Sequence, residues 1–283
     1  MKRARKRSAI GRIGRFVIGA AACGFGFLIY VSLTLPDVRP LRTSNPTTTA
    51  FMQLRAQEAR DAGRPVHAVQ QWTKYSRISP QLIRAVLVAE DDAFWQHEGV
   101  DFEQLQESLQ VDWARGRLTR GGSTITQQLA KNLYLSPSKN PVRKLREFLI
   151  ARRLEAELPK SRILELYLNV IEWGDGIYGA EAAARTCFHT SASALGPAQA
   201  ALLAAAIVNP RLLNPAHPTA RLLRRQQLIL RRMGSVVPPV EDAPSPPAGP
   251  VIVVPSDDGA VPPAEVPAEP PPEAPAEPPV EIK

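Results

Sequence analysis

Three carboxylates stand in a row in the stretch AEDDAFWQHEGVD, residues 89–101: Glu90, Asp91 and Asp92. The apolar residues that share a helix face with Glu90, by their spacing, are Ile83, Val86 and Leu87. Glu90 therefore continues an apolar face, whereas the two aspartates fall outside it. Burial, the neighbouring acids and a helix C-terminal end all predict a raised pKa for Glu90. A carboxylate tuned toward neutral pH suits a general base, and a frayed acidic helix end is the alternative.

A second candidate acid is Glu147, which follows Arg143 and Lys144 by four and three residues. Those two cations lie on its helix face and are predicted to keep it ionised. Two glutamates in opposite environments are typical of acid/base sites that act on sugars. Taken alone, Glu147 is explained more simply by a surface helix with ordinary ion pairs.

The stretch RGGSTITQQLAKN, residues 120–132, combines two glycines with side chains that can hold oxyanions. These side chains are hydroxyls, amides and one cation: Ser123, Thr124, Thr126, Gln127, Gln128, Lys131 and Asn132. Glycines followed by hydroxyls at a helix start can hold phosphate oxygens. The stretch is no P-loop, because it lacks G-K-[ST]. A plain capped helix is the alternative.

Helical periodicity dominates residues 36–237, where strand-like alternation is hard to find. Helices are predicted to begin at Ser79-Pro80 and Asn140-Pro141, where a capping side chain precedes a proline. Further helices are predicted at residues 161–171, 196–208 and 217–233. The segment 196–208 is apolar nearly all round and should be central, and the last helix carries cations on its outer face.

Both ends of the chain differ from this helical part. Residues 1–15 hold seven cations and no acid, and residues 16–35 hold no charge. This pattern predicts a basic cytoplasmic segment and a transmembrane anchor. An uncleaved anchor is favoured over a signal peptide, because the apolar run is long and lacks an A-x-A pattern. Residues 238–283, with 16 prolines and nine acids, are typical of a disordered tail, which leaves residues 36–237 as the folded domain.

The charges point to an anionic partner. The chain carries +8 in total, with +7 in the first fifteen residues and −8 in the tail, so the domain carries +9. Lipid headgroups, phosphates or an acidic polymer fit this charge, and nucleic acid is not expected outside the membrane. The two cysteines, Cys23 and Cys187, form no disulfide framework, and the four scattered histidines lack metal-ligand spacing.

Five segments in order resemble the motifs of the biosynthetic peptidoglycan glycosyltransferases, glycosyltransferase family 51. They read EDDAFWQHEGVD, GGSTITQQLAKN, RKLREFLIARRLE, KSRILELYLN and GIYGAEAAA. The resemblance covers about residues 36–233 and fits the monofunctional, membrane-anchored form. It implies a mainly α, lysozyme-like fold behind one N-terminal transmembrane helix. It also implies that a periplasmic domain at the inner membrane polymerises lipid II into glycan strands.

The resemblance assigns roles to individual residues. Glu90 matches the general base and Glu147 the second essential glutamate. The positions that line the pyrophosphate and sugar site are Ser123, Gln128, Lys131 and Asn132, with Gln127 as a further binding candidate from the same stretch. Arg143 and Lys144 match cations of the third motif. Asn169 is expected to be structural, and His97 to orient its loop.

The implied reaction transfers the growing chain from undecaprenyl pyrophosphate to the 4-hydroxyl of the lipid II GlcNAc, with inversion. No cofactor is required. A divalent cation, Mg or Mn, stays open, as do partners from the division or elongation machinery. The alternatives are a lytic lysozyme-like muramidase, a non-enzymatic wall scaffold and a bifunctional penicillin-binding protein, which would need a transpeptidase domain. Where relatives usually have Tyr-Phe-Gly after the fifth motif, this chain has Cys187-Phe188-His189, so the shape of that turn is open.

Overall fold

The computed structural model describes residues 2–102, 106, 122–136 and 140–235, and the predicted tail at 238–283 lies outside them. Helix α1, Lys2–Leu33, contains a stretch, Arg15–Leu33, that is long and apolar enough to cross a membrane. This stretch coincides with the predicted anchor, residues 16–35, except that the helix ends at Leu33. Two arginines of a later helix donate to carbonyls at this end: Arg153 to Ser32 and Arg146 to Thr34.

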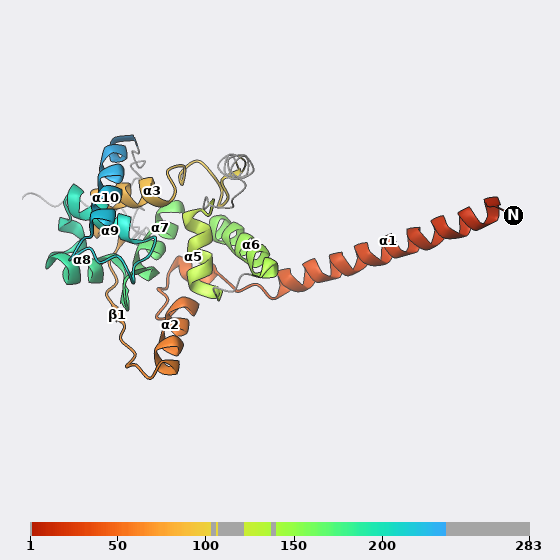
Figure 1. The fold of residues 1–283 in the computed structure, drawn as a ribbon, viewed down its shortest axis with the longest axis horizontal. Helices are drawn as coiled ribbons and strands as arrows, with labels where there is room; N and C mark the ends of the chain where they lie inside the picture. The colour runs from red at the N-terminus through yellow and green to blue at the C-terminus, as the bar shows by residue number, and fades with distance from the viewer. Residues whose placement is uncertain (1, 103–105, 107–121, 137–139, 236–283) are drawn as a thin grey trace, which may run out of the picture. The chain divides into compact units, whose positions relative to one another are not determined.

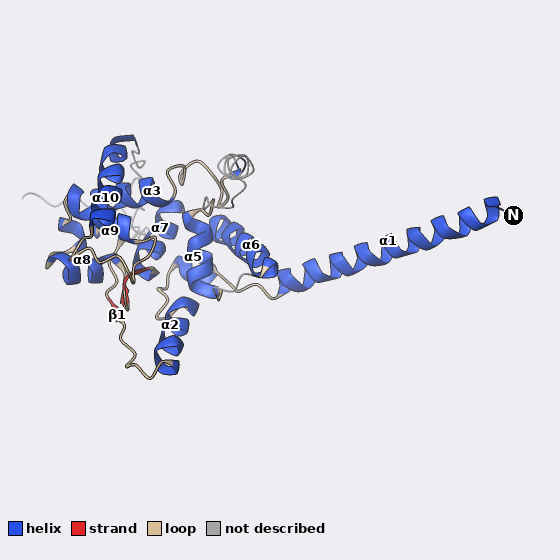
Figure 2. Ribbon diagram, in the orientation of Figure 1, coloured by secondary structure: helices blue, strands red, loops and turns tan. Residues whose placement is uncertain are grey.

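Helices make up most of the described chain, which confirms the mainly α prediction (Figures 1 and 2). After α1 they are α2 (Ala50–Asp61), α3 (Pro80–Glu90), α5 (Ile125–Tyr134), α6 (Pro141–Glu157), α7 (Lys160–Val170), α8 (Ala180–Phe188), α9 (Pro197–Ala206) and α10 (Ala220–Arg232). Short 3₁₀ turns lie at Arg39–Arg42, Tyr75–Arg77, Ala192–Ala194 and Met233–Ser235.

Side-chain caps fix several helix starts. Ser79 accepts a hydrogen bond from the backbone N–H of residue 81, and Asn140 accepts one from residue 142. Thr124 and Thr219 cap α5 and α10 in the same way. Each cap satisfies a backbone donor that the first helical turn leaves unpaired. The predicted starts at Ser79-Pro80 and Asn140-Pro141 are therefore confirmed.

The apolar core is built around α9 and α5. Every residue of α9 from Ala200 to Ala206 is buried, and α9 packs against α3 and α10. The prediction that this segment is central is confirmed. Helix α5 packs against α6, α7 and α2. The turn that follows α3 links the two groups of helices, because it runs from the end of α3 toward the start of α5 (Figure 1).

A small sheet was not predicted. Its strands are β1 (Val69–Gln70), β2 (Glu172–Gly174) and β3 (Ile177–Tyr178), in the order β1-β3-β2. Strand β3 pairs parallel with β1 and antiparallel with β2. Strands of two or three residues are too short to show an alternating pattern.

Asn169 ties the end of α7 to the segment before α3. Its Oδ1 accepts from the Thr73 N–H and its Nδ2 donates to the Thr73 carbonyl, both at 2.8 Å. The fully buried side chain thus satisfies both backbone groups of Thr73, as a neighbouring strand would, in agreement with its expected structural role.

The turn after α8 is formed by His189, which adopts φ 53° and ψ 33°. Glycine reaches this left-handed conformation without strain, whereas other residues reach it at a cost. The histidine therefore occupies a backbone conformation that suits the glycine expected from the motif.

Candidate active site

Glu90 is the last residue of α3, on the face that packs into the core. The residues that share this face are buried: Ile83, Val86 and Leu87. Asp91 adopts φ −167° and ψ 81°, which ends the helix and places Glu90 at its carboxyl end. The Glu90 side chain keeps 13% of its exposure, so the prediction of a mostly buried acid on this face is confirmed.

A chain of two hydrogen bonds holds the Glu90 carboxylate. Gln128 Nε2 donates to Glu90 Oε2 at 2.9 Å, and Gln128 Oε1 accepts from the Tyr167 hydroxyl at 3.0 Å. Because a carboxylate only accepts, the amide nitrogen must face Glu90 and the amide oxygen must face Tyr167. Tyr167 is fully buried in α7 and therefore fixes the orientation of the Gln128 amide.

Burial raises the pKa of Glu90, as predicted. The hydrogen bond from Gln128 and the charges of Arg225 and Lys131 lower it in part, and Asp91 adds a smaller upward contribution. The direction of the net shift makes Glu90 a stronger base than an exposed glutamate.

The prediction that Asp91 lies outside the buried face is wrong. Asp91 is only 3% exposed, and its carboxylate accepts from the Ile125 N–H at 2.9 Å and contacts His97 Nε2 at 2.9 Å. The helical spacing fails there because α3 has already ended. Asp91 instead places a negative charge at the N-terminus of α5, where backbone N–H groups stabilise it. Asp92 is exposed and pairs with Arg232 at 2.6 Å.

Lys160 contacts the turn that follows α3 through hydrogen bonds and a ring contact. Its Nζ donates to the His97 carbonyl at 2.6 Å and to Glu155 Oε1 at 2.9 Å, and it lies 4.3 Å from the centre of the Phe94 ring. Glu155 also accepts from the Thr126 hydroxyl at 2.5 Å. These contacts and the Asp91–His97 pair form a closed ring that joins the turn to α5, α6 and α7.

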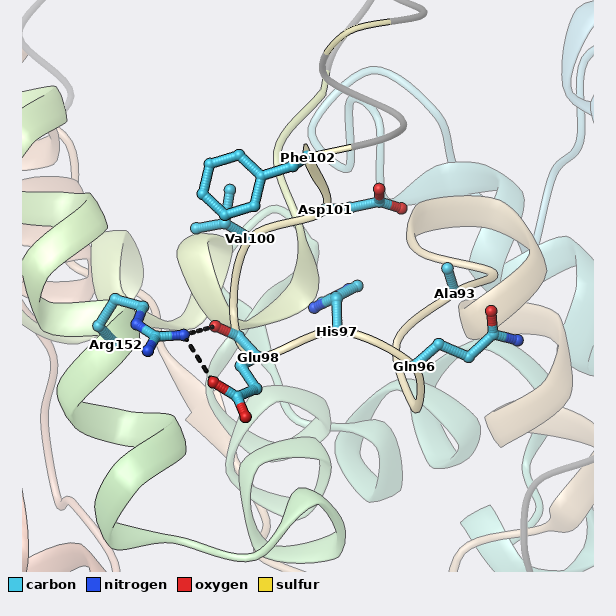
Figure 3. Close-up of a pocket in the computed structure, with 8 residues that line it drawn as sticks. All are labelled: Ala93, Gln96, His97, Glu98, Val100, Asp101, Phe102 and Arg152. Atoms are coloured by element: carbon cyan, nitrogen blue, oxygen red, sulfur yellow. Dashed lines mark hydrogen bonds and ion pairs between the residues drawn. The ribbon is translucent and has the colours of Figure 1, made fainter.

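The outer side of the same turn is held by Arg152, which donates to the carbonyl and the carboxylate of Glu98 (Figure 3). A hollow of about 430 Å³ lies beside the turn, and its lining includes neither Glu90 nor Glu147. His97 lines this hollow, and its ring contacts Asp91, in agreement with the expectation that it orients the loop.

Glu147 lies on the buried side of α6, with Ile150, Ala151 and Leu154, and not on its exposed side. It is 3% exposed and pairs with Arg143 at 2.6 Å and with Lys144. Lys144 Nζ also donates to Ser123 Oγ at 3.1 Å and to Gln127 Oε1 at 3.4 Å. The structure therefore brings together the predicted binding residues of the second and third motifs.

Lys131 lies on α5 between the two glutamates. Burial lowers its pKa, Arg143 and Lys144 lower it further, and Glu147 and Glu90 raise it. The influence of both glutamates shows that Lys131 lies within the electrostatic reach of each. Helix α5 thus contacts both sites. Gln128 bonds to the desolvated acid Glu90, and Gln127 bonds to Lys144, which pairs with Glu147.

Asn132, another predicted binding residue, makes its side-chain hydrogen bond within its own helix, α5. Its Nδ2 donates to the Gln128 carbonyl at 2.8 Å, one turn earlier in α5, and its side chain is buried. This bond supports the helix turn that presents Gln128. Asn132 is therefore connected to Glu90 through Gln128, which bonds to both residues.

Two residues near Glu90 were missed from the sequence. Tyr167 lies in the segment 161–171, which was predicted only to be a helix, and nothing in its local spacing points to Gln128. Arg225 was assigned to the outer face of the last helix, but its Nη2 lies 3.9 Å from Glu90 Oε1. The signal for Arg225 was present, because it lies three residues after Leu222 and four before Ile229, which are both buried.

Comparisons with known proteins identify the family of the chain. Residues 58–234 match the family model described as Transglycosylase. A biosynthetic peptidoglycan transglycosylase of Laribacter hongkongensis is 45% identical over 223 residues, which cover 79% of this chain and 98% of that protein. A protein of the same name from Aromatoleum aromaticum is 53% identical over 167 residues, 59% of this chain and 73% of that protein. A third, from Dechloromonas aromatica, is 47% identical over 200 residues, 71% of this chain and 84% of that protein. The chain belongs to the transglycosylase family.

Proposed function

We propose that this chain polymerises lipid II into glycan strands at a membrane, with Glu90 as the general base. The observation that carries the proposal is the pair of glutamates with opposite environments, joined by α5. Glu90 is desolvated and held by Gln128. Glu147 is buried against two cations, one of which reaches the residues at the start of α5.

In the proposed step, Glu90 takes the proton from the 4-hydroxyl of the lipid II GlcNAc. The freed oxygen forms a bond to the anomeric carbon of the growing chain from the face opposite the leaving group, which inverts the configuration. The bond from that carbon to the pyrophosphate oxygen breaks, and undecaprenyl pyrophosphate leaves with the electron pair. A carboxylate with a raised pKa is suited to accept this proton.

The leaving pyrophosphate is proposed to bind the cationic cluster of Lys131, Arg143 and Lys144. Fixed cations stabilise charge that develops on a leaving group. Glu147 acts as a positioning residue, because it pairs with both cations of α6.

The proposed step requires no cofactor. Among the described residues, no group of three or more His, Cys, Asp or Glu side chains could hold a metal ion. Where a divalent cation, Mg or Mn, takes part, we propose that it binds the pyrophosphate.

The placement at the membrane follows from α1 and from the charge. A helix able to span the bilayer precedes a domain of net charge +9, so an anionic, lipid-linked substrate stays at the surface where the domain is held. We propose a cytoplasmic N-terminus and a periplasmic domain, because cations precede the span. Proteins of the division or elongation machinery are proposed partners.

A lytic muramidase would share the paired carboxylates. It cleaves finished glycan and releases no pyrophosphate, so the cluster around Glu147 would have no use in it. A wall scaffold would need neither glutamate. The cations around Glu147 favour transfer over the lytic alternative, and the buried, hydrogen-bonded setting of Glu90 favours an enzyme over a scaffold.

The test is polymerisation of purified lipid II by the detergent-solubilised full chain, with product sizing in the presence and absence of moenomycin. Glu90→Gln should lower the rate by about 10²- to 10⁴-fold, the usual contribution of a general base. Asp92→Asn, a change of an exposed acid in the same run, serves as the matched control and should leave the rate near wild type. A Glu90→Gln enzyme that polymerises at a normal rate would exclude the base assignment, and cleavage of finished wall would favour the lytic alternative.

A further inference from the structure

Arg225 and Gln128 approach different oxygens of the Glu90 carboxylate. Gln128 of α5 occupies Oε2, and Arg225 of α10 lies 3.9 Å from Oε1. Arg225 is held on the inward stripe of α10 between the buried residues Leu222 and Ile229. Packing of α10 against α9 and α3 therefore brings the Arg225 side chain, which is 38% exposed, next to Glu90.

The Arg225 guanidinium is not fully engaged by protein groups. Its Nε is buried and has no hydrogen-bond partner among the residues that the structure describes. At 3.9 Å its Nη2 is within ion-pair reach of Glu90 but beyond a direct hydrogen bond. The guanidinium thus acts on Glu90 mainly through its charge.

The groups that face Glu90 come from three parts of the fold: the residue after α3, helix α5 and helix α10. Asp91 follows it in the chain and opposes its ionisation, as burial does. Gln128 and Lys131 of α5 favour the ionised form, as does Arg225 of α10. Lys131 is shared with the cluster around Glu147, whereas Arg225 is closest to Glu90 on the Oε1 side.

We propose that Arg225 is a positioning residue that keeps Glu90 ionised and oriented before the acceptor hydroxyl arrives. This inference rests on the proposed function, in which Glu90 is the base. Burial favours the protonated form of Glu90, and a protonated carboxyl cannot accept a proton. The Arg225 charge offsets part of the effect of burial on the ionisation of Glu90, and Gln128 still binds Oε2.

The sign of the effect follows from the charge. Removing a cation next to a carboxylate favours its protonated form, so the pKa of Glu90 should rise above its already raised value. The general base must be ionised to act, and the acidic limb of the pH–rate profile reports its ionisation. Loss of Arg225 should therefore move that limb to higher pH.

The experiment compares Arg225→Met with Arg225→Lys and with Arg224→Met, a change of the neighbouring, exposed arginine. Initial polymerisation rates at subsaturating lipid II are measured from pH 5 to pH 9. Arg225→Met should lose about tenfold on the acidic side and approach the wild-type rate on the alkaline side. Arg225→Lys should restore most of the acidic limb, and Arg224→Met should follow the wild-type profile.

Two results would overturn the inference. An equal loss at every pH would assign Arg225 to substrate binding or to folding, and thermal unfolding of the variants separates those two. An Arg225→Met profile identical to wild type would show that Arg225 has no influence on Glu90. Glu90→Gln measured in parallel keeps the tests distinct: if it is inactive at every pH, the base assignment stands whatever Arg225 does, and if it is active, the proposed function fails.

Discussion

Replacement of Lys160 by methionine tests how firmly the turn after Glu90 is held. Methionine keeps the apolar stem of the side chain, but it removes the ammonium group with its charge, both hydrogen bonds and the contact with the Phe94 ring. The His97 carbonyl and the Glu155 carboxylate each lose a donor. The turn that carries Asp91 should therefore lose its main attachment to α6 and α7.

The expected cost follows from the burial of the pair. The exposed fractions are 19% for the Lys160 side chain and 8% for Glu155. Breaking a buried ion pair by removal of one partner costs about 3–5 kcal/mol, because the other charge is left uncompensated. The partial exposure of the lysine places the expected loss in the free energy of unfolding near the lower end, about 3 kcal/mol. Adding Glu155→Gln removes the stranded charge and should restore about 1–2 kcal/mol.

The matched control is Arg152→Met, which removes the other cation bound to this turn. Arg152 and Glu98 are 48% and 80% exposed, so their pair should contribute about 1 kcal/mol or less. Urea unfolding of the solubilised full chain measures the wild type and all three variants, and lipid II polymerisation should slow most in Lys160→Met. Equal costs for Lys160→Met and Arg152→Met would refute the argument from burial. A further loss on addition of Glu155→Gln would refute the argument from the stranded charge.

Three further predictions concern single side chains. Tyr167→Phe leaves the Gln128 amide oxygen without its donor and should cost about 1–3 kcal/mol in thermal unfolding, with a slower initial rate. Glu90→Gln should raise the thermal stability at pH 8. The folded pKa of Glu90 lies above the unfolded value of 4.5, so its stabilising contribution is full below pH 4.5 and is lost as pH rises through the folded pKa. The gain should thus vanish in a pH series of melting curves below pH 4.5. His189→Gly should add about 1 kcal/mol by relieving the left-handed conformation at φ 53°, measured by thermal unfolding against an unchanged rate.

Several helices could be predicted because their signals are local, whereas α2 and α8 were not predicted. Ser79 and Asn140 start helices through bonds to backbone groups two residues away. The apolar character of residues 200–206 predicted the central place of α9. The face of Glu90 followed from residues within two turns of the same helix.

The same reasoning failed where a helix ended or where a partner came from a distant segment. Asp91 was placed outside the buried face because the helical spacing was continued past the end of α3. Its partners, Ile125 and His97, belong to other segments. The small sheet was missed because its strands are shorter than one period of alternation.

The sequence by itself determined a helix able to span a membrane, several further helices, the two candidate glutamates and the family resemblance, since motif order and periodicity are properties of the chain. Only the tertiary structure decided that Gln128 contacts Glu90, that Tyr167 fixes Gln128, and that Arg225 lies beside the same carboxylate. These contacts join α3, α5, α7 and α10, which are far apart in the chain. The free energy that brings them together comes from burial of a shared core, and burial specifies which faces turn inward without naming the partner that each inward residue meets.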